Sequence, residues 1–330
     1  MTVAEQIAKE FAPTDNGVKY HSVLKVASAN KWINDASKRP MPKKLFGGLW
    51  HSGELSVLFA DTGVGKTILA VQIADGVSSG NSKEPFTNEA EPQKILYIDF
   101  ELTDKQFQMR YTNKETEKMH VFNDNFLRAE VNSDEEISDE IIMASIEDEV
   151  IKTGAKVIVI DNITYLKNET EKGRNALPLM KHLNQLKKKY GLSILVLAHT
   201  PKRDGTRPIH LTDLYGSVMI ANFIDGAFAI GRSSDGANFR YIKQLKCRSD
   251  EVEFHSENVA FMELVKDNNM IQFTFNDYNT EEQHLKQVSN SEKNELIDRI
   301  HSLADSGKTQ REIAKEIDRS IGFVNKHLKQ

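Results

Sequence analysis

The chain has 330 residues, of which 39% are hydrophobic and 28% charged, and its formal net charge of -5 at pH 7 argues against a uniformly basic nucleic-acid-binding coat. No stretch approaches the roughly 18 apolar residues of a membrane span, and residues 1–9 lack the apolar run of a signal peptide, so we expect a globular, cytoplasmic protein without a membrane partner. The single cysteine, Cys247, excludes an internal disulfide and a metal cluster built from cysteines.

Residues 1–44 form a polar lead-in segment. They contain one predicted helix, from Val23 to Ile33, after which Pro40 and Pro42 break the chain. We therefore place this segment before the main domain.

A phosphate-binding loop follows the predicted strand 55–59. Gly63 and Gly65 allow backbone amides to turn toward phosphate oxygens, and the start of the next helix adds its positive dipole end. Lys66 can reach the β and γ phosphates of ATP, and Thr67 can ligate Mg²⁺. A glycine-rich turn without a ligand is the alternative. The predicted nucleotide-binding residues are Ala60, Asp61, Thr62, Gly63, Val64, Gly65, Lys66 and Thr67.

The segments after this loop predict an α/β fold with a mostly parallel sheet. Three near-continuous apolar strands are separated by helical segments, and such strands are typical of a sheet that is covered on both faces. They lie at 95–100, 157–161 and 193–198. Beyond Gly231 the strands become shorter and are predicted to form antiparallel hairpins at the sheet edge. These lie at 241–246, 252–255, 260–264 and 270–275.

An acidic run lies between two of these strands. From Glu130 to Glu149 there are nine Asp or Glu residues and no Lys or Arg. We interpret it as a solvated helical face, with a role in binding a metal or a partner as the alternative.

Polar residues end three of the predicted parallel strands, where ligands bind in open α/β sheets. Asp161 is predicted to hold the magnesium shell opposite Thr67, with a helix N-cap as the alternative. Glu101 is placed to orient or deprotonate an attacking water, with a surface carboxylate as the alternative. His199 can sense the γ-phosphate, although a structural histidine fits the same position.

Four motifs, in this order, resemble those of the RecA-like ATPase family. They are the phosphate-binding loop, a strand that ends in Asp-Phe-Glu, a strand that ends in Asp161 and a strand that ends in His199. Within the family, residues 42–278 are similar to the hexameric RepA- and DnaB-type replicative helicases. The resemblance implies a RecA-like core at 45–278, ATP and Mg²⁺ as cofactors, and a homo-oligomer, a hexamer in that branch. It also implies that Glu101 is the catalytic base and that His199 couples the nucleotide state to DNA.

Two basic elements extend the resemblance. Lys246 and Arg248 match the Lys-x-Arg pair that such proteins insert into the ATP site of the neighbouring subunit. Residues two apart on a strand face the same side, so both cations could meet a γ-phosphate there; solvated edge-strand cations are the alternative. The loop after His199 carries Lys202, Arg203 and Arg207 and suits a single-stranded DNA backbone, unless it is merely solvated.

The C-terminal residues 291–330 predict a small helical domain after a polar linker at 279–290. A helix with an apolar stripe ends near Gly307, a capping box at Thr309 and Glu312 begins a second helix, and Ser320 caps a third. The positions expected to be apolar and buried are Leu296, Ile297, Ile300, Leu303, Ile313, Ala314, Ile317, Val324 and Leu328.

Residues 310–329 resemble the helix-turn-helix of bacterial site-specific recombinases and sigma-like regulators. Residues 308–329 hold six Lys or Arg against three Asp or Glu, which favours contact with duplex DNA. The predicted DNA-binding side chains are Asn325, Lys326 and Lys329. A packing or oligomerisation role is the alternative.

Together these features favour an ATP-hydrolysing, DNA-binding motor, an enzyme of the ATPase class and, by resemblance, a DNA helicase. A plasmid, phage or mobile element is the natural setting. The protein would bind single-stranded DNA through its core and duplex DNA through its C-terminal domain. The alternative from another class is an ATP-controlled DNA-binding regulator or assembly factor without unwinding activity, as in KaiC-like relatives.

Overall fold

The computed structural model describes residues 24–131, 138–163, 176–200, 203–214, 220–267, 269–287, 290–317 and 321–328. The chain divides into two units, 1–41 and 42–330. In the first unit, helix α2 (Ala29–Ser37) begins later than predicted, because the Ser28 hydroxyl caps it by accepting a hydrogen bond from the Lys31 N–H. No side chain of α2 is buried.

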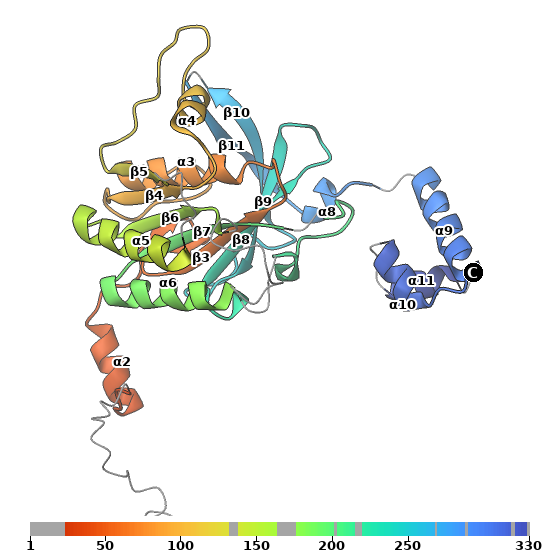
Figure 1. The fold of residues 1–330 in the computed structure, drawn as a ribbon, viewed down its shortest axis with the longest axis horizontal. Helices are drawn as coiled ribbons and strands as arrows, with labels where there is room; N and C mark the ends of the chain where they lie inside the picture. The colour runs from red at the N-terminus through yellow and green to blue at the C-terminus, as the bar shows by residue number, and fades with distance from the viewer. Residues whose placement is uncertain are drawn as a thin grey trace, which may run out of the picture. The chain divides into compact units, whose positions relative to one another are not determined.

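The second unit is built on a nine-stranded sheet in its described residues, with the order β11-β10-β9-β8-β3-β7-β6-β4-β5 (Figure 1). The six strands from β8 to β5 in this order run parallel to one another, and β9, β10 and β11 extend the sheet antiparallel. The predicted α/β fold class with a mostly parallel sheet is thereby confirmed. The strands are β3 (Leu55–Ala60), β4 (Ile95–Asp99), β5 (Phe126–Glu130), β6 (Val157–Asp161), β7 (Ser193–His199), β8 (Gly226–Arg232), β9 (Phe239–Lys246), β10 (Val259–Asp267) and β11 (Met270–Asn279). A separate pair, β1 (Lys44–Phe46) and β2 (Trp50–His51), precedes them.

One predicted strand is absent, and four of the described strands were not predicted. Residues 252–255 form no strand, because the Gln244 side chain accepts a hydrogen bond from the Glu253 N–H at 2.7 Å in place of a ladder partner. The strands that were not predicted are β1, β2, β5 and β8.

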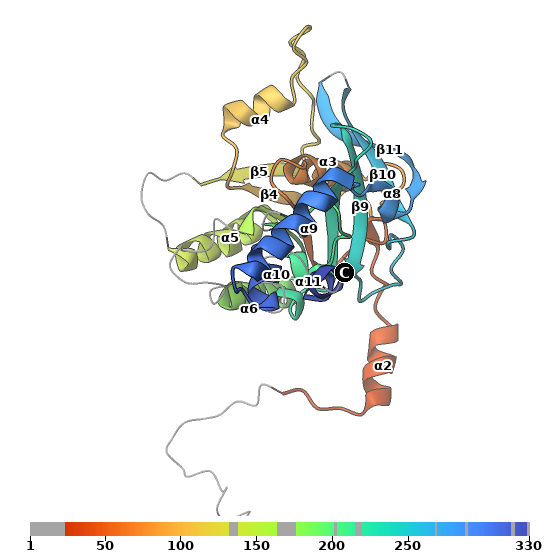
Figure 2. The same cartoon turned by 90° about the vertical axis from the view of Figure 1, so that its right-hand side faces the viewer.

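Helices cover both faces of the parallel strands, with α3 (Lys66–Ser79) on one face and α5 (Asp139–Thr153) and α6 (Ala176–Tyr190) on the other (Figure 1, Figure 2). The side chains of β3 alternate between the two cores: Val57 packs with α5 and α6, whereas Leu58 packs with α3. This two-sided burial explains the continuous apolar runs. Among the helices that the structure describes, none has the length and apolar character needed to cross a membrane.

The carboxyl ends of β3, β4, β6 and β7 lie at one edge of the sheet, because these strands are parallel and paired in register. Asp99 of β4 is paired with Asp161 of β6, and Ala60 of β3 with His199 of β7. The residues that follow these strands are therefore brought together although they are far apart in the sequence.

Three helices lie in the C-terminal region: α9 (Asn290–Asp305), α10 (Gln310–Glu316) and α11 (Ile321–Leu328). The predicted capping box is present, since the Thr309 hydroxyl accepts from the Glu312 N–H and the Glu312 carboxylate accepts from the Thr309 N–H. The helices share a small core of their own, made of Ile300, Ile313, Ala314, Ile317 and Val324. The predicted cap Ser320 lies outside the described residues, and the DNA-binding role of these helices stays a prediction.

The segment predicted as a linker, 279–290, begins differently from expectation. Its first residues form a helical turn, α8 (Glu281–His284), in which the side chains of Glu281 and His284 are both buried. The burial of these two side chains attaches the start of the segment to the sheet.

Candidate nucleotide-binding site

The phosphate-binding loop connects β3 to α3 through two glycines with left-handed backbone. Gly63 has φ 70° and Gly65, the N-cap of α3, has φ 113°. A Cβ at Gly65 would lie 2.8 Å from Cζ of Phe273 in β11, so a larger residue would meet both strain and a clash. Arg240 supports the loop from β9 by donating from Nε to the Val64 carbonyl at 3.1 Å.

Lys66 connects this loop to β7. Its Nζ donates to the carbonyls of Ala60 and Asp61 at 3.1 and 3.3 Å and lies 3.0 Å from Nδ1 of His199. An ammonium can only donate, so Nδ1 of His199 is the acceptor in this contact. Burial lowers the pKa of Lys66, while the nearby carboxylates of Glu101, Asp161 and Asp61 act in the opposite direction.

Asp161 ends β6 in a buried position beside Thr67. One carboxylate oxygen, Oδ2, accepts a hydrogen bond from the Tyr97 hydroxyl at 2.6 Å, whereas Oδ1 is buried and has no hydrogen-bond partner among the described residues. The pKa of Asp161 is raised to about 6, because the effect of burial is larger than the opposite effect of the hydrogen bonds from Tyr97 and Thr67. The carboxylate therefore has one oxygen, Oδ1, that is available to bind a cation.

Glu101 faces the same site from the end of β4. Its Oε1 accepts a hydrogen bond from Nδ2 of Asn162 and lies 3.3 Å from Nε2 of His199. The hydrogen bond with His199 lowers the pKa of Glu101 against the effect of burial, and Lys66 and Asn162 lower it further. An ionised carboxylate that is 39% exposed can act as a base toward a water molecule.

Part of this set lines a cavity of about 570 Å³, although Asp161 is not among its lining residues. The cavity brings together Lys66, Thr67, Glu101 and His199 from the predicted set, and its full lining is Thr62, Gly63, Gly65, Lys66, Thr67, Ile68, Glu101, Arg110, His199 and Leu264. Arg110, which ends helix α4 (Asp104–Arg110), was not predicted, and no sequence signal marks it. Asn162 was not predicted either, although its place directly after Asp161 at a strand end is such a signal.

A large part of the chain matches a known family. The family described as an AAA domain matches residues 22–205, more than half of the 330 residues. The chain belongs to this AAA domain family. None of the curated proteins matches the sequence. Among solved structures, this AAA domain protein is similar to a KaiC-like protein from the hyperthermophilic archaeon Pyrococcus horikoshii, with 19% identity, coverage of 69% of this chain and 93% of that chain, and a TM-score of 0.46.

The site of this AAA domain fits a nucleoside triphosphate with Mg²⁺. Asp161 has an oxygen without a partner in the described part of the chain, and the Thr67 side chain hydrogen-bonds to the same carboxylate. Carboxylate and hydroxyl oxygens are the ligands that Mg²⁺ prefers, and glycine turns leave amides free for phosphate oxygens. Thr67 and Asp161 would hold the ion, and the backbone of 60–67 the phosphates.

Lys246 and Arg248 contact one turn of their own chain. Lys246 donates from Nζ to the Ala221 carbonyl at 2.5 Å, and Arg248 pairs through Nη1 with Asp225 Oδ1 at 3.1 Å. Burial lowers the pKa of Lys246, and the nearby Arg248 adds to this. The Arg248 side chain is 51% exposed, so another subunit could reach it. Their predicted role in a neighbouring ATP site stays a prediction.

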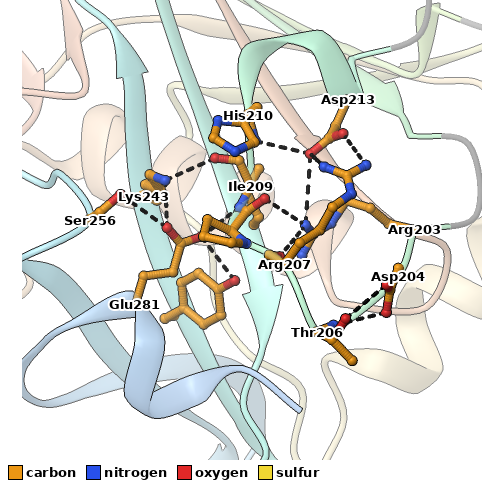
Figure 3. A network of polar contacts seen from close by, with 12 residues as sticks. Arg203, Asp204, Thr206, Arg207, Ile209, His210, Asp213, Lys243, Ser256 and Glu281 are labelled. Carbon is orange, nitrogen blue, oxygen red and sulfur yellow. Dashed lines mark hydrogen bonds and ion pairs between the residues drawn. The ribbon is translucent and has the colours of Figure 1, made fainter. Parts of the chain in front are cut away.

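The basic loop after His199 is held by a network that the sequence did not indicate (Figure 3). Arg207 makes two hydrogen bonds to the Asp213 carboxylate, at 2.6 and 3.1 Å, and Arg203 donates to the carbonyls of Arg207 and Pro208. The Arg203 side chain is only 12% exposed, so it supports the loop from within instead of presenting a free cation as expected. Lys202 lies outside the described residues.

A buried ion pair connects this loop to α8. Glu281 accepts hydrogen bonds from the Ile209 N–H at 2.7 Å and from Lys243 Nζ at 2.5 Å, and Lys243 also donates to the Ile209 carbonyl (Figure 3). Both side chains are less than 8% exposed. The start of the predicted linker therefore fixes the backbone of the basic loop.

Glu281→Gln is expected to lower the free energy of unfolding by about 3 to 5 kcal/mol, because it leaves the buried Lys243 ammonium without its counter-charge. Urea unfolding of the full chain measures this. The matched control is Glu149→Gln, which removes an exposed ion pair with Lys152 and should change little. Equal, small effects of the two substitutions would mean that the buried pair does not hold α8 on the sheet.

Proposed function

We propose that this protein is an Mg-ATP-dependent, DNA-binding motor that assembles as a ring, a hexamer in the helicase branch that it resembles. The observation that carries the proposal is the convergence of Lys66, Thr67, Asp161, Glu101 and His199 at one edge of the sheet. A replicative-helicase-like role in a plasmid, phage or other mobile element is the proposed setting.

Each residue has a role in the proposed hydrolysis. Lys66 leaves the carbonyls of the loop to contact the β and γ phosphates, and Glu101 orients the attacking water and accepts its proton. The Mg²⁺ ion, when bound, neutralises developing charge on the phosphates. His199 contacts Lys66 through Nδ1 and Glu101 through Nε2. A phosphate that draws Lys66 away therefore removes one partner of the imidazole ring whose other nitrogen faces the proposed base.

His199 also provides the proposed connection to DNA. It ends β7, and the basic loop follows within a few residues. Arg207 is 43% exposed and is the more accessible of the two described cations of this loop, so we assign it together with Lys202 to contact with a single-stranded backbone. Arg203 would then act by shaping the loop.

The second candidate function is an ATP-controlled DNA-binding regulator or assembly factor that does not unwind DNA. One observation favours it: Arg203 and Arg207 both pair with Asp213. This pairing leaves fewer cations free to bind a DNA strand that passes through the ring. Strand displacement on forked DNA separates the two functions. A motor displaces the strand in an ATP-dependent manner, whereas a regulator hydrolyses ATP and binds DNA without displacement.

The proposed duplex-binding surface is α11, on which Lys326 is exposed. Lys326→Gln should weaken duplex binding and reduce the slope of log affinity against log salt by about 0.9, since one phosphate contact is lost. Fluorescence anisotropy over a salt series measures both quantities. Lys188→Gln, at an exposed position near the end of α6, makes the same charge change and should leave both unchanged. If Lys326→Gln behaves like Lys188→Gln, α11 does not contact duplex DNA through this side chain. The predicted contact Lys329 lies outside the described residues.

A further inference from the structure

The turn that carries Glu101 is shaped by the residue that ends β4. The Asp99 side chain is fully buried, and its Oδ1 accepts hydrogen bonds from the backbone N–H groups of Glu101 and Leu102 at 3.0 and 2.9 Å. A carboxylate that accepts both of these N–H groups fixes the direction in which the chain leaves the strand. Glu101 therefore leaves β4 in one direction, toward His199 and Asn162.

Arg128 holds this turn from the neighbouring strand β5. Its Nε donates to Asp99 Oδ2 at 3.0 Å, and its Nη2 donates to the Leu102 carbonyl. The remaining nitrogen, Nη1, donates to Glu130 at 3.1 Å. One guanidinium thus binds both the carboxylate that shapes the turn and the carbonyl at its end, which a planar fork of donors can do and a single ammonium cannot.

The same side chain also contacts the next element. The Arg128 guanidinium lies over the ring of Phe107 in α4, 5.0 Å from its centroid. Helix α4 begins at Asp104, directly after the turn, and presents Arg110 to the nucleotide cavity. A displacement of Arg128 would therefore move the turn and the start of α4 together.

We propose that Arg128 is a positioning residue for ATP hydrolysis, which holds the Glu101 carboxylate in its place through Asp99 and the Leu102 carbonyl. The inference rests on the proposed function, since it assumes that Glu101 is the base. Arg128 does not line the cavity itself and is 17% exposed. The contacts of Arg128 named above are in β4, β5, α4 and the turn after β4, and none is in the phosphate-binding loop. Arg128 therefore acts on the rate of the chemical step and not on the binding of the nucleotide.

The test is steady-state Mg-ATP hydrolysis by the full-length Arg128→Lys protein. We expect kcat to fall by about 10- to 100-fold, the loss typical of a misplaced catalytic group. Binding of a fluorescent ATP analogue should be unchanged, as should the melting temperature within a few degrees. Lys94→Gln is the matched control: it removes an exposed cation at the other end of β4 and should leave kcat and binding unchanged.

A double mutant distinguishes positioning from general support of the fold. If Arg128 acts through Glu101, then Arg128→Lys should not lower further the residual hydrolysis of Glu101→Gln, because the group that it positions is already absent. An unchanged kcat in Arg128→Lys, a loss of analogue binding, or full additivity in the double mutant would each overturn the inference. If the wild-type protein does not hydrolyse ATP, the proposed function falls, and the positioning role with it.

Discussion

Glu101→Gln is expected to lower the rate of ATP hydrolysis by about 10² to 10⁴-fold, the range that a general base contributes. The amide keeps the shape of the side chain and can still contact His199, but it cannot accept a proton from water. Binding of ATP should be retained, because the phosphate contacts come from the loop of 60–67 and not from Glu101. Steady-state hydrolysis and binding of a fluorescent ATP analogue measure the two effects separately.

Lys66→Ala is the companion substitution and should differ in kind. It removes the ammonium that the phosphates would bind, so ATP binding and turnover are both expected to be lost. The assignment of Glu101 as the base would be contradicted by a Glu101→Gln protein that hydrolyses ATP at half the wild-type rate.

Arg248→Ala should lower hydrolysis by roughly 10³-fold or more if Arg248 completes the ATP site of a neighbouring subunit, since an arginine finger contributes that much. In its own chain Arg248 pairs with Asp225, which also accepts hydrogen bonds from Lys187 and the Leu55 N–H. Asp225 therefore keeps other partners when Arg248 is removed. We expect the variant to fold and to bind ATP, with hydrolysis lost.

Mixing two inactive proteins shows whether Arg248 acts in trans. Arg248→Ala subunits supply an intact Lys66, and Lys66→Ala subunits supply an intact Arg248, so some mixed interfaces contain both groups. Activity above the sum of the two separate proteins is the expected result. If subunits exchange, as shown by fluorescence energy transfer, and no activity appears, Arg248 acts within its own chain or not at all.

The sequence was a good guide to residues at strand ends. Glu101, Asp161 and His199 follow apolar runs, and parallel pairing places such ends together whatever the details of the loops. The same reasoning could not find β8, because its Gly-Ala-Phe-Ala-Ile-Gly run has small side chains and a weak strand signal. Its place beside β3 is decided by pairing between residues more than 160 positions apart.

Roles that depend on side-chain partners were the hardest to predict. Arg203 and Arg207 look like free cations in the sequence, but Asp213 lies close enough to bind them once the loop is folded. Asp99 was predicted only as part of the strand that ends in Asp-Phe-Glu, and no strand was predicted around Arg128. Only the register that pairs β4 with β5 brings the two side chains together. The number of charged residues in a loop therefore does not predict which partners those residues bind in the folded protein.

The most direct test of the account is ATP hydrolysis by the wild-type full-length protein with Mg²⁺, with and without single-stranded DNA, beside strand displacement on forked DNA. We predict Mg²⁺-dependent hydrolysis that single-stranded DNA accelerates, together with ATP-dependent displacement. Hydrolysis without any response to DNA would contradict the proposed connection through His199 and the basic loop. An absence of hydrolysis under all these conditions would contradict the assignment of the site itself.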